Sequence, residues 1–296
     1  MSSQLYYYGE STCKGIKRDG SVCVNKAYYV GELCGVHSKD KIALPKNPDA
    51  GKLAEQKLHD DKVAIEQAMQ LNKAQGKRGQ LILTKLAMMK SPPDVKGFLK
   101  VFPNYKHGNR RDGWDLPALS PKSIGPVHHG QPGLPPSENL ENLHQGNKLF
   151  HGESMDEFVA HRFEMYTDKI PHRHKSDKYP QLKHISNKNI PIKSIWINKS
   201  GIPIDTTYFE SRQVYCNIYY KMIVNHLQYL KLAESLNDGY NLQICGYDAY
   251  PITHTIEYHY LDTSKPFGHE LVLYAMLMND LIWEKYTFLD NLFIGK

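Results

Sequence analysis

Apolar side chains recur along this chain at spacings that divide it into separate elements. Residues 52–72 place them three and four positions apart among charged residues, which predicts an amphipathic helix. The same spacing returns over residues 81–89, 158–165, 211–236 and 268–282, so we expect helices there too. The pattern therefore predicts a mainly helical protein.

Two stretches have the pattern of strands. Residues 190–204 alternate apolar and polar side chains around Trp196 and contain a turn at Ser200-Gly201, which predicts a short hairpin. Residues 241–247 form a short apolar run bounded by Asp238-Gly239, as expected for a compact strand. The expected fold class is α+β, with one large and mainly helical domain that contains a short sheet.

Proline and glycine mark the irregular parts of the chain. Residues 103–138 are rich in both and too long for a simple connection, while interleaved apolar residues favour an ordered loop packed on a core. The polar run at residues 171–180 predicts a surface excursion. With breaks near Pro45 and Pro92, we expect a zinc-binding module (1–44), a basic helical connector (45–96) and the α+β domain (97–296).

The composition is that of an ordinary globular protein of 296 residues, with 41% hydrophobic and 23% charged residues. No apolar run approaches the roughly 20 residues that span a bilayer, and residues 1–10 lack a signal-peptide pattern. We expect an intracellular protein, cytoplasmic or nuclear, with no membrane partner. Five cysteines, an odd number, fit a reducing compartment better than a disulfide framework.

The net charge of +6 is concentrated between residues 73 and 100. Against Asp94, this segment carries Lys73, Lys77, Arg78, Lys85, Lys90, Lys96 and Lys100. We expect nucleic acid as the partner of such a basic segment. A helix face that only meets water explains the same charges, and the oligomeric state is left open.

Cysteine and histidine gather near the start of the chain. Cys13, Cys23, Cys34 and His37 supply the thiolates and imidazole that a tetrahedral structural Zn²⁺ needs, although only the last pair has tight spacing. Residues 10–38 hold too few apolar side chains to fold alone, so the metal would be their core. The alternative is unrelated free cysteines near a chance histidine. The segment also resembles a small zinc-binding module of viral and phage proteins.

A helix predicted over residues 138–150 carries the candidate chemistry. Glu141, Gln145 and Lys148 stand at positions i, i+4 and i+7, which places them on one face. Polar groups on one face beside apolar neighbours predict a helix that lines a binding site. A surface helix with ordinary polar pairs is the alternative.

These residues resemble a motif of the NADAR (YbiA-like) family, which is associated with NAD and ADP-ribose metabolism. The family has an L-S-N loop followed by a helix of the form E-H-x-x-Q-x-x-K-F. The corresponding residues here are Leu119-Ser120-Pro121 and then Glu141, Asn142, Gln145, Lys148, Leu149 and Phe150. Pro121 and Asn142 replace the family's asparagine and histidine, and Leu149 precedes the phenylalanine.

The resemblance covers roughly residues 112–280. Residues 212–236, 241–248 and 267–278 stand where the family has an arginine helix, a strand with an aspartate turn, and a closing helix. The family's W-G-x-G signature is replaced by residues 246–248, and Gln243 stands at the strand glutamate.

The resemblance implies hydrolysis of an N-glycosidic bond to ribose, as in an ADP-ribosylated base or a related ribosyl substrate. The substrate would be part of a nucleic acid or a free molecule. The resemblance also implies catalytic roles for Glu141 and Asp248. It implies substrate binding by Asn142, Gln145, Lys148, Arg212 and His269. Structural alternatives are open: Asp248 as a turn former, Arg212 paired with Glu210, and residues 269–270 as a helix start.

Two further interpretations compete with an enzyme. A non-catalytic, zinc-containing protein that binds nucleic acid explains the basic segment, and a virion-associated scaffold is consistent with the viral likeness of the module. A catalytic zinc is disfavoured, because four protein ligands leave no open coordination position. The histidines of residues 171–175 offer metal ligands, or simply belong to an exposed basic loop.

Overall fold

A computed structural model describes residues 7–87, 91–104, 110–182 and 191–286. The chain forms two compact units, Met1–Asp61 and Lys62–Lys296. Helix α1 (Ala50–Ala74) contributes residues to both. We describe each unit by itself.

The first unit is built from loops rather than from long strands. Isolated antiparallel bridges join its backbone at Thr12–Lys26, Ile16–Val22, Tyr29–Leu33 and Tyr29–Ala43. Its buried apolar side chains are those of Cys13, Cys23, Ala27 and Cys34. Aliphatic side chains such as Val24 and Val36 are 71% and 80% exposed. Apolar burial therefore does not account for the fold of this unit.

The helices of the second unit occur mostly in groups between its strands rather than in strict alternation with them, as expected for an α+β chain. In order after α1 they are η1 (Pro117–Leu119), α2 (Leu140–Gly146), α3 (Met155–Thr167), α4 (Lys175–Lys178), α6 (Tyr208–Ile223), α7 (Leu227–Asn237), α8 (Ile256–Leu261), α9 (His269–Leu277) and η2 (Ile282–Lys285). Within the described residues no helix has the length and apolar character needed to cross a membrane.

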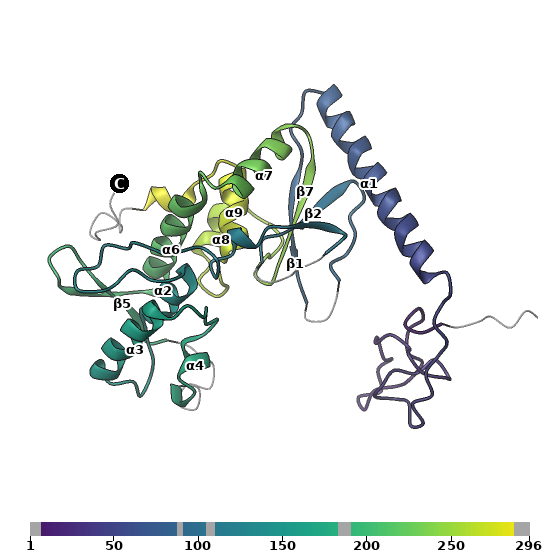
Figure 1. Cartoon of the computed structure of the whole chain (residues 1–296), viewed down its shortest axis with the longest axis horizontal. Helices are drawn as coiled ribbons and strands as arrows, with labels where there is room; N and C mark the ends of the chain where they lie inside the picture. The colour runs from purple at the N-terminus through teal and green to yellow at the C-terminus, as the bar shows by residue number, and fades with distance from the viewer. Residues whose placement is uncertain (1–6, 88–90, 105–109, 183–190, 287–296) are drawn as a thin grey trace, which may run out of the picture. The chain divides into compact units, whose positions relative to one another are not determined.

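The second unit contains a four-stranded parallel sheet, which lies beside helices α8 and α9 (Figure 1). Its strands, in spatial order, are β1 (Leu81–Lys85), β7 (Asn241–Gly246), β2 (Phe98–Phe102) and β3 (Gly113–Asp115). Leu242 of β7 pairs with Leu81 on one side and Leu99 on the other. Every residue of β7 is buried, as expected for a central parallel strand. Because all pairs are parallel, the carboxyl ends of the strands meet at one edge.

A second, antiparallel sheet contains β4 (Lys148–Leu149), β5 (Lys193–Ile197) and β6 (Pro203–Thr206). Trp196 pairs with Ile204, and Ser194 pairs with Lys148. The β5–β6 pair confirms the hairpin predicted over residues 190–204, of which Ile190 lies outside the described residues. Pairing with β5 holds β4 in place directly after the end of α2.

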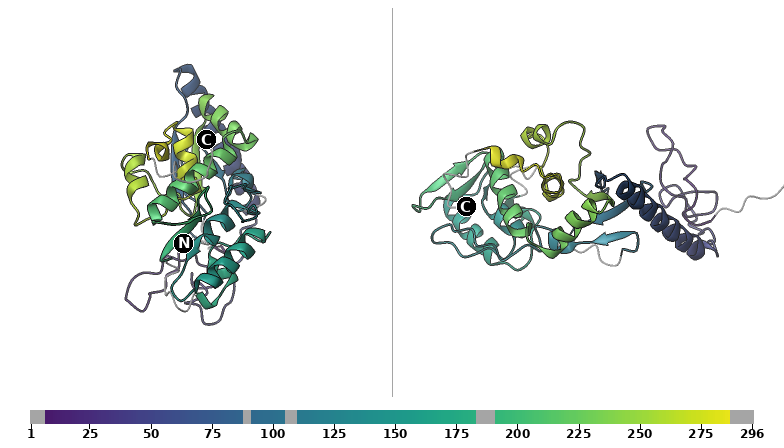
Figure 2. Two further views of the ribbon diagram at one scale, coloured as in Figure 1. Left: turned by 90° about the vertical axis from the view of Figure 1, so that its left-hand side faces the viewer. Right: turned by 90° about the horizontal axis from the view of Figure 1, so that it is seen from above.

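Helices α6 and α9 lie side by side, and α9 also contacts β1 and β7 (Figures 1 and 2). The α9 sequence HELVLYAML is buried at most positions because it lies in the main core. Val214 and Tyr219 of α6 and Leu271 and Val272 of α9 belong to this core. The amino end of α9 is thereby fixed near the strands of the parallel sheet.

The predicted α+β class is confirmed, but several predicted helices differ from the structure. The helix predicted over residues 138–150 ends at Gly146, and Lys148 and Leu149 form β4. Residues 81–85 form β1, because LILTK pairs with the central strand and buries Leu83. The helix predicted over 211–236 is interrupted after Ile223, and α7 begins at Leu227. His226 caps that second helix by accepting a hydrogen bond from the backbone N–H of Gln228.

The polar run at residues 171–180 is not wholly a surface excursion. It contains α4, in which Lys175 is fully buried. The Lys175 ammonium lies 2.5 Å from the Glu153 carboxylate and donates to the backbone oxygen of Lys148 at 3.0 Å. Burial lowers the pKa of Lys175 to about 8, although Glu153 opposes the shift. Through its hydrogen bond to the Lys148 backbone, this lysine joins α4 to β4.

Shortening one buried side chain of β7 tests how far the fold depends on this strand. We expect Ile244→Ala to lower the free energy of unfolding by about 2–5 kcal/mol, because Ile244 is 0% exposed. Leu227→Ala, at a side chain that is 81% exposed, is the matched control and should change it by about 0.5 kcal/mol or less. Denaturant unfolding measures both, and equal effects would contradict the assigned core.

Candidate functional site

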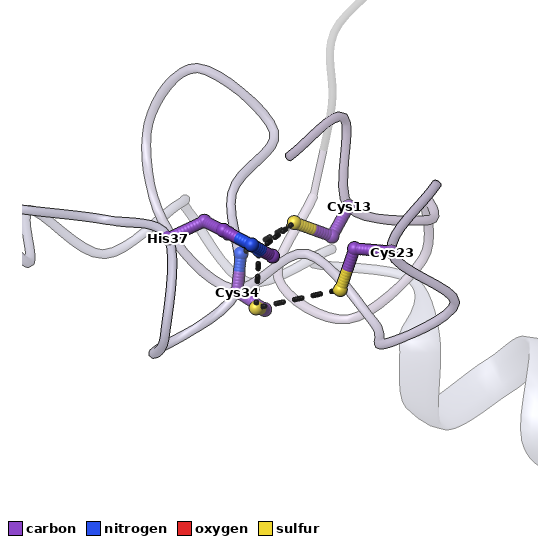
Figure 3. A group of neighbouring side chains, drawn as sticks. All are labelled: Cys13, Cys23, Cys34 and His37. Atoms are coloured by element: carbon purple, nitrogen blue, oxygen red, sulfur yellow. Dashed lines mark hydrogen bonds between the residues drawn. The ribbon is translucent and has the colours of Figure 1, made fainter. Parts of the chain in front are cut away.

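The four predicted metal ligands come together in the first unit (Figure 3). Nδ1 of His37 lies 3.3 Å from Sγ of both Cys13 and Cys34, and the thiols of Cys23 and Cys34 are 3.9 Å apart. All four ligand atoms lie within 4.8 Å of one another. The group is positioned to bind a metal ion.

The local backbone supports thiolate ligands at this site. The N–H groups of Gly15 and Cys34 donate to Sγ of Cys13 at 3.3 and 3.2 Å. Burial opposes ionisation of Cys34, but the backbone N–H groups of Val36 and His37 lower its pKa to about 6. A Cβ on Gly15 would lie 2.3 Å from Cγ of His37, so glycine is required there.

Loss of one ligand tests the metal site. We expect the wild-type chain to carry about one metal ion and His37→Asn to lose it, because three remaining ligands hold the ion less tightly. His59→Asn, at an exposed position on α1, is the matched control and should keep the metal. Elemental analysis of the purified proteins by mass spectrometry measures this. Unchanged metal content in His37→Asn would contradict the assignment.

The candidate chemical site lies in the second unit, at the carboxyl edge of the parallel sheet. Lys85 ends β1, Pro103 follows β2, and Asp248 follows β7. The register of the three strands brings these ends to the same edge. In open α/β sheets this edge is where ligands usually bind.

Three predicted residues form a continuous polar chain from α2 to β4. Asn139 caps α2 by accepting from the backbone N–H of Asn142, which fixes the start of the helix. Nε2 of Gln145 donates to Glu141 at 3.0 Å, and Nζ of Lys148 donates to Oε1 of Gln145 at 3.1 Å. The structure brings Glu141, Gln145 and Lys148 together, but not on one helix face as predicted, because α2 ends at Gly146 and Lys148 begins β4.

Burial shifts the pKa values of Glu141 and Lys148, which stand at the two ends of this hydrogen-bonded series. It raises the pKa of Glu141, while Gln145, Lys122, Lys148 and His269 oppose the rise. It lowers the pKa of Lys148 to about 8, which Glu141 opposes. A carboxyl group with few water contacts and several nearby cations is a typical acid–base arrangement.

Asp248, His269 and Glu270 adjoin this polar chain. Burial raises the pKa of Asp248, and Glu270 raises it further. His269 lowers the pKa of both Asp248 and Glu141, so its ring lies within electrostatic range of each carboxyl group. We call the group Glu141, Gln145, Lys148, Asp248, His269 and Glu270 the Glu141 cluster.

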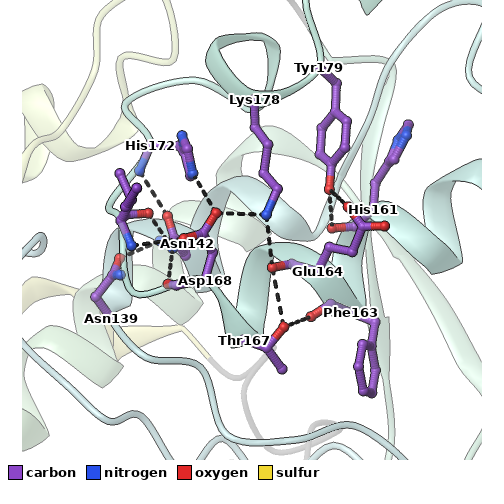
Figure 4. Close-up of polar contacts among 11 residues, drawn as sticks. Asn139, Asn142, His161, Phe163, Glu164, Thr167, Asp168, His172, Lys178 and Tyr179 are labelled. Carbon is purple, nitrogen blue, oxygen red and sulfur yellow. Dashed lines mark hydrogen bonds and ion pairs between the residues drawn. The ribbon is translucent and has the colours of Figure 1, made fainter.

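Asn142 has structural partners, and its predicted substrate-binding role stays a prediction. Its side chain is fully buried and faces the loop that follows α3 (Figure 4). Nδ2 donates to the backbone oxygens of Asp168 and Ile170, and Oδ1 accepts from the N–H of His172. With its amide used by three backbone groups, Asn142 holds this loop against α2.

Arg212 likewise has structural partners, and its predicted substrate-binding role stays a prediction. The guanidinium group is buried and donates to the backbone oxygens of Tyr260, Asp262 and Lys265. It does not pair with Glu210, which instead forms a capping box with Thr207 at the start of α6. Arg212 therefore joins α6 to the end of α8.

Sequence analysis missed cations that surround the Glu141 cluster. Lys122 acts on Glu141, Arg173 acts on Asp248, and both act on His174. Lys122 follows the Leu119-Ser120-Pro121 loop, so its place beside the motif was a usable signal. Arg173 belongs to the run taken for a surface excursion, and the sequence held no sign that it approaches Asp248.

The basic segment at residues 73–100 does not form one surface helix. Lys100 is buried beside Asp94 and Asp112, and Arg78 donates to the backbone oxygen of Leu277 at 2.7 Å. Lys85 lies 4.1 Å from the ring centroid of Tyr250, and Lys90 lies outside the described residues. Binding of nucleic acid by this segment stays a prediction.

Comparisons with protein-family models, with curated proteins and with solved structures find no match.

The raised pKa of Glu141 predicts a pH-dependent cost in stability. A carboxyl group with a raised folded-state pKa loses free energy of unfolding as the pH rises from its ordinary value, about 4.5, through the raised one. We therefore expect Glu141→Gln to melt at a higher temperature than wild type at pH 7.5. The gain should shrink toward pH 4.5, where both side chains are largely neutral. Calorimetry measures this.

Glu138→Gln, at an exposed carboxyl group beside the same helix, is the matched control. It should show no such gain. A Glu141→Gln protein that melts below wild type at pH 7.5 would contradict the electrostatic description.

Proposed function

We propose that the metal of the first unit is a structural Zn²⁺. Three thiolates and one imidazole are the ligand set of structural zinc, whereas Mg²⁺ and Ca²⁺ take oxygen ligands. Three of the ligand-atom pairs are 3.3–3.9 Å apart and all lie within 4.8 Å, which suits a tetrahedral ion of this size. Zinc would supply the core that the few buried apolar side chains of this unit do not supply.

We propose that the second unit hydrolyses an N-glycosidic bond between ribose and a base, in an ADP-ribosylated base or a related ribosyl substrate. The observation that carries this proposal is the desolvated carboxyl group of Glu141, joined through Gln145 to Lys148 beside the carboxyl edge of the sheet. The resemblance of residues 141–150 to the NADAR helix motif supports the same chemistry.

The neighbours of Glu141 and Asp248 favour different protonation states. Lys122, Lys148 and His269 all favour the Glu141 carboxylate. The two largest influences on the pKa of Asp248 are burial and then Glu270, and both favour the neutral form of this carboxyl group. Burial raises the pKa of both groups, but the next largest influence lowers it for Glu141 (the hydrogen bond from Gln145) and raises it for Asp248 (Glu270). This difference suits Glu141 to act as the base and Asp248 as the acid.

The reaction follows from these assignments. The Glu141 carboxylate accepts a proton from a water molecule, whose oxygen bonds to the anomeric carbon as the bond to the base nitrogen breaks. Neutral Asp248 gives its proton to that nitrogen. The negative charge of Glu141 also stabilises the oxocarbenium-like carbon during the step. The proton gained by Glu141 and that lost by Asp248 balance over the cycle.

The cations around the cluster suit a phosphate-bearing substrate. Lys148 is half-buried, and Lys122 and Arg173 act on the same groups from other segments. Ammonium and guanidinium groups at such a site bind phosphate oxygens and gain strength from the limited water. A ribosyl phosphate or an ADP-ribosyl group presents this charge beside the bond to be broken.

Release of ADP-ribose from ADP-ribosylated guanine DNA, followed by chromatography, tests the function. We expect wild type to release it and Glu141→Gln to be slower by about 100-fold or more, the usual effect of losing a general base. Glu138→Gln should retain the wild-type rate. A ribosyl phosphate carrying an aminopyrimidine is the second substrate, assayed by the same separation.

Turnover that is equal in wild type and Glu141→Gln would contradict the catalytic role of this residue. No release from either substrate would sink the enzymatic proposal and favour a non-catalytic protein that binds nucleic acid or belongs to a virion. Binding to the same DNA without turnover, weakened steeply by salt, would identify the first of these.

A further inference from the structure

Four aromatic rings form a row that adjoins the Glu141 cluster. The ring centroid of His144, on α2, lies 5.1 Å from that of Tyr215, on α6. The centroids of Tyr215 and Tyr219 are 6.3 Å apart with ring planes 26° from parallel, and Tyr219 is 6.2 Å from His269 at the start of α9. Because three helices contribute these rings, the fold assembles the row and no local motif reveals it.

One end of the row is held firmly by backbone groups. The hydroxyl group of Tyr219, a residue that is 0% exposed, donates to the backbone oxygen of Leu119 at 2.7 Å. Nε2 of His269 lies 2.8 Å from the backbone oxygen of Pro103. Tyr215 stands four residues before Tyr219 on α6, which places it one turn away on the same helix face. The Tyr215 ring therefore has a fixed position beside the cluster.

The other end of the row has polar groups that the fold does not use. His144 and Tyr215 are both half-buried. Nδ1 of His144 is buried without a hydrogen-bond partner, and no described residue forms a hydrogen bond with its Nε2 or with the Tyr215 hydroxyl group. Burial and then Lys148 lower the pKa of His144, so its ring is neutral. A neutral imidazole offers one donor and one acceptor.

The Glu270 carboxyl group is buried beside that of Asp248. Glu270 is 1% exposed at the second position of α9. A Cβ built on Gly246 would lie 2.0 Å from its Oε1, and one built on Gly268 would lie 2.9 Å from its Oε2 and 3.3 Å from Oδ2 of Asp248. Two glycines thus leave room for the carboxyl groups. In the proposed reaction Asp248 gives its proton to the base nitrogen, so the base would lie at this place.

The side of the site formed by α6 is aromatic. Burial raises the pKa of the Tyr215 hydroxyl group, and Glu141 raises it further, which places this ring within electrostatic range of the carboxyl groups. Lys122, Lys148 and Arg173, the cations assigned to phosphate, come from segments other than α6. An uncharged ring beside the acid and base suits a heteroaromatic group better than a phosphate.

We propose that Tyr215 and His144 form the binding surface for the planar base of the substrate, in which the base stacks on the Tyr215 ring and its polar edge hydrogen-bonds to His144. These roles rest on the proposed function for the identity of the substrate. Stacking on tyrosine is open to every purine and pyrimidine, because each base has a π-face. With the base at Tyr215 and the phosphate at the cations, the bond between base and ribose lies beside Glu141 and Asp248.

Binding of 2-aminopurine riboside monophosphate by the full-length protein tests this surface without turnover. Stacking on an aromatic ring quenches the fluorescence of this base, so we expect quenching when the nucleotide binds to wild type. Tyr215→Leu should bind it about 10-fold or more weakly and quench it less, since stacking on an aromatic ring is lost. Tyr215→Phe keeps the ring and should retain both properties.

Ribose 5-phosphate, which has no base, separates loss of stacking from damage to the site. Its dissociation constant, measured by calorimetry, should be the same in wild type and Tyr215→Leu. Tyr258→Leu is the matched control, because Tyr258 of α8 also packs on a histidine, His254, with 4.4 Å between ring centroids, and is 52% exposed. It should leave the binding of both ligands unchanged.

Three results would overturn the proposal. They are equal affinity of wild type for the two ligands, unchanged nucleotide binding in folded Tyr215→Leu, and equal weakening of both ligands in that variant. If Tyr215→Leu does not fold, carbon-13 NMR of tyrosine-labelled wild type decides, with Tyr215→Phe to assign the signals. Tyr215 ring signals that move upfield with the nucleotide but not with ribose 5-phosphate would support stacking, and signals that do not distinguish the ligands would overturn it.

Failure of the proposed function gives a different result. Wild type that binds the nucleotide through Tyr215 but turns over neither ribosyl substrate would count against hydrolysis alone. Turnover of a substrate without base-dependent binding would count against the Tyr215 surface alone.

Discussion

The parallel pairing of β7 between β1 and β2 is the constraint on which the rest of the second unit depends. It brings the ends of three strands that are far apart in sequence to one edge, so that Lys85, Pro103 and Asp248 become neighbours in space. The core contacts of α9 with β1 and β7 then place its first turn at the same edge. The Glu141 cluster exists because this register is fixed.

Local patterns predicted the elements whose signal is local. The amphipathic spacing of α1, the alternation of β5 and β6 and the apolar run of β7 were read correctly from the sequence. So was the grouping of Cys13, Cys23, Cys34 and His37, which the structure brings together. The helix face predicted for Glu141, Gln145 and Lys148 was only partly right, because α2 ends at Gly146 and Lys148 belongs to β4. The metal site needs only one short segment of chain to be complete.

The features that the sequence could not predict depend on strand pairing and burial between residues that are far apart in the chain. LILTK was read as a helix, because a short apolar run does not distinguish a buried strand from a helix until its partner β7 is known. Asn142 and Arg212 have side chains typical of substrate-binding residues, yet each is occupied by backbone carbonyl groups from distant segments. Glu270 was read correctly as part of a helix start, but nothing in the sequence indicated that its side chain is buried.

Gly246 and Gly268 leave the space that the Glu270 side chain occupies, so the residues possible at these three positions depend on one another. A side chain at Gly246 would occupy the space of the Glu270 carboxyl group, so it is tolerated only where Glu270 has become shorter, whereas one at Gly268 would also clash with Cβ of Asp248. Conversely, a shorter residue at Glu270 leaves a gap that a methyl group at Gly246 would fill. These positions are therefore expected to vary as one unit across related sequences, and a design that altered one of them would need to alter its neighbours as well.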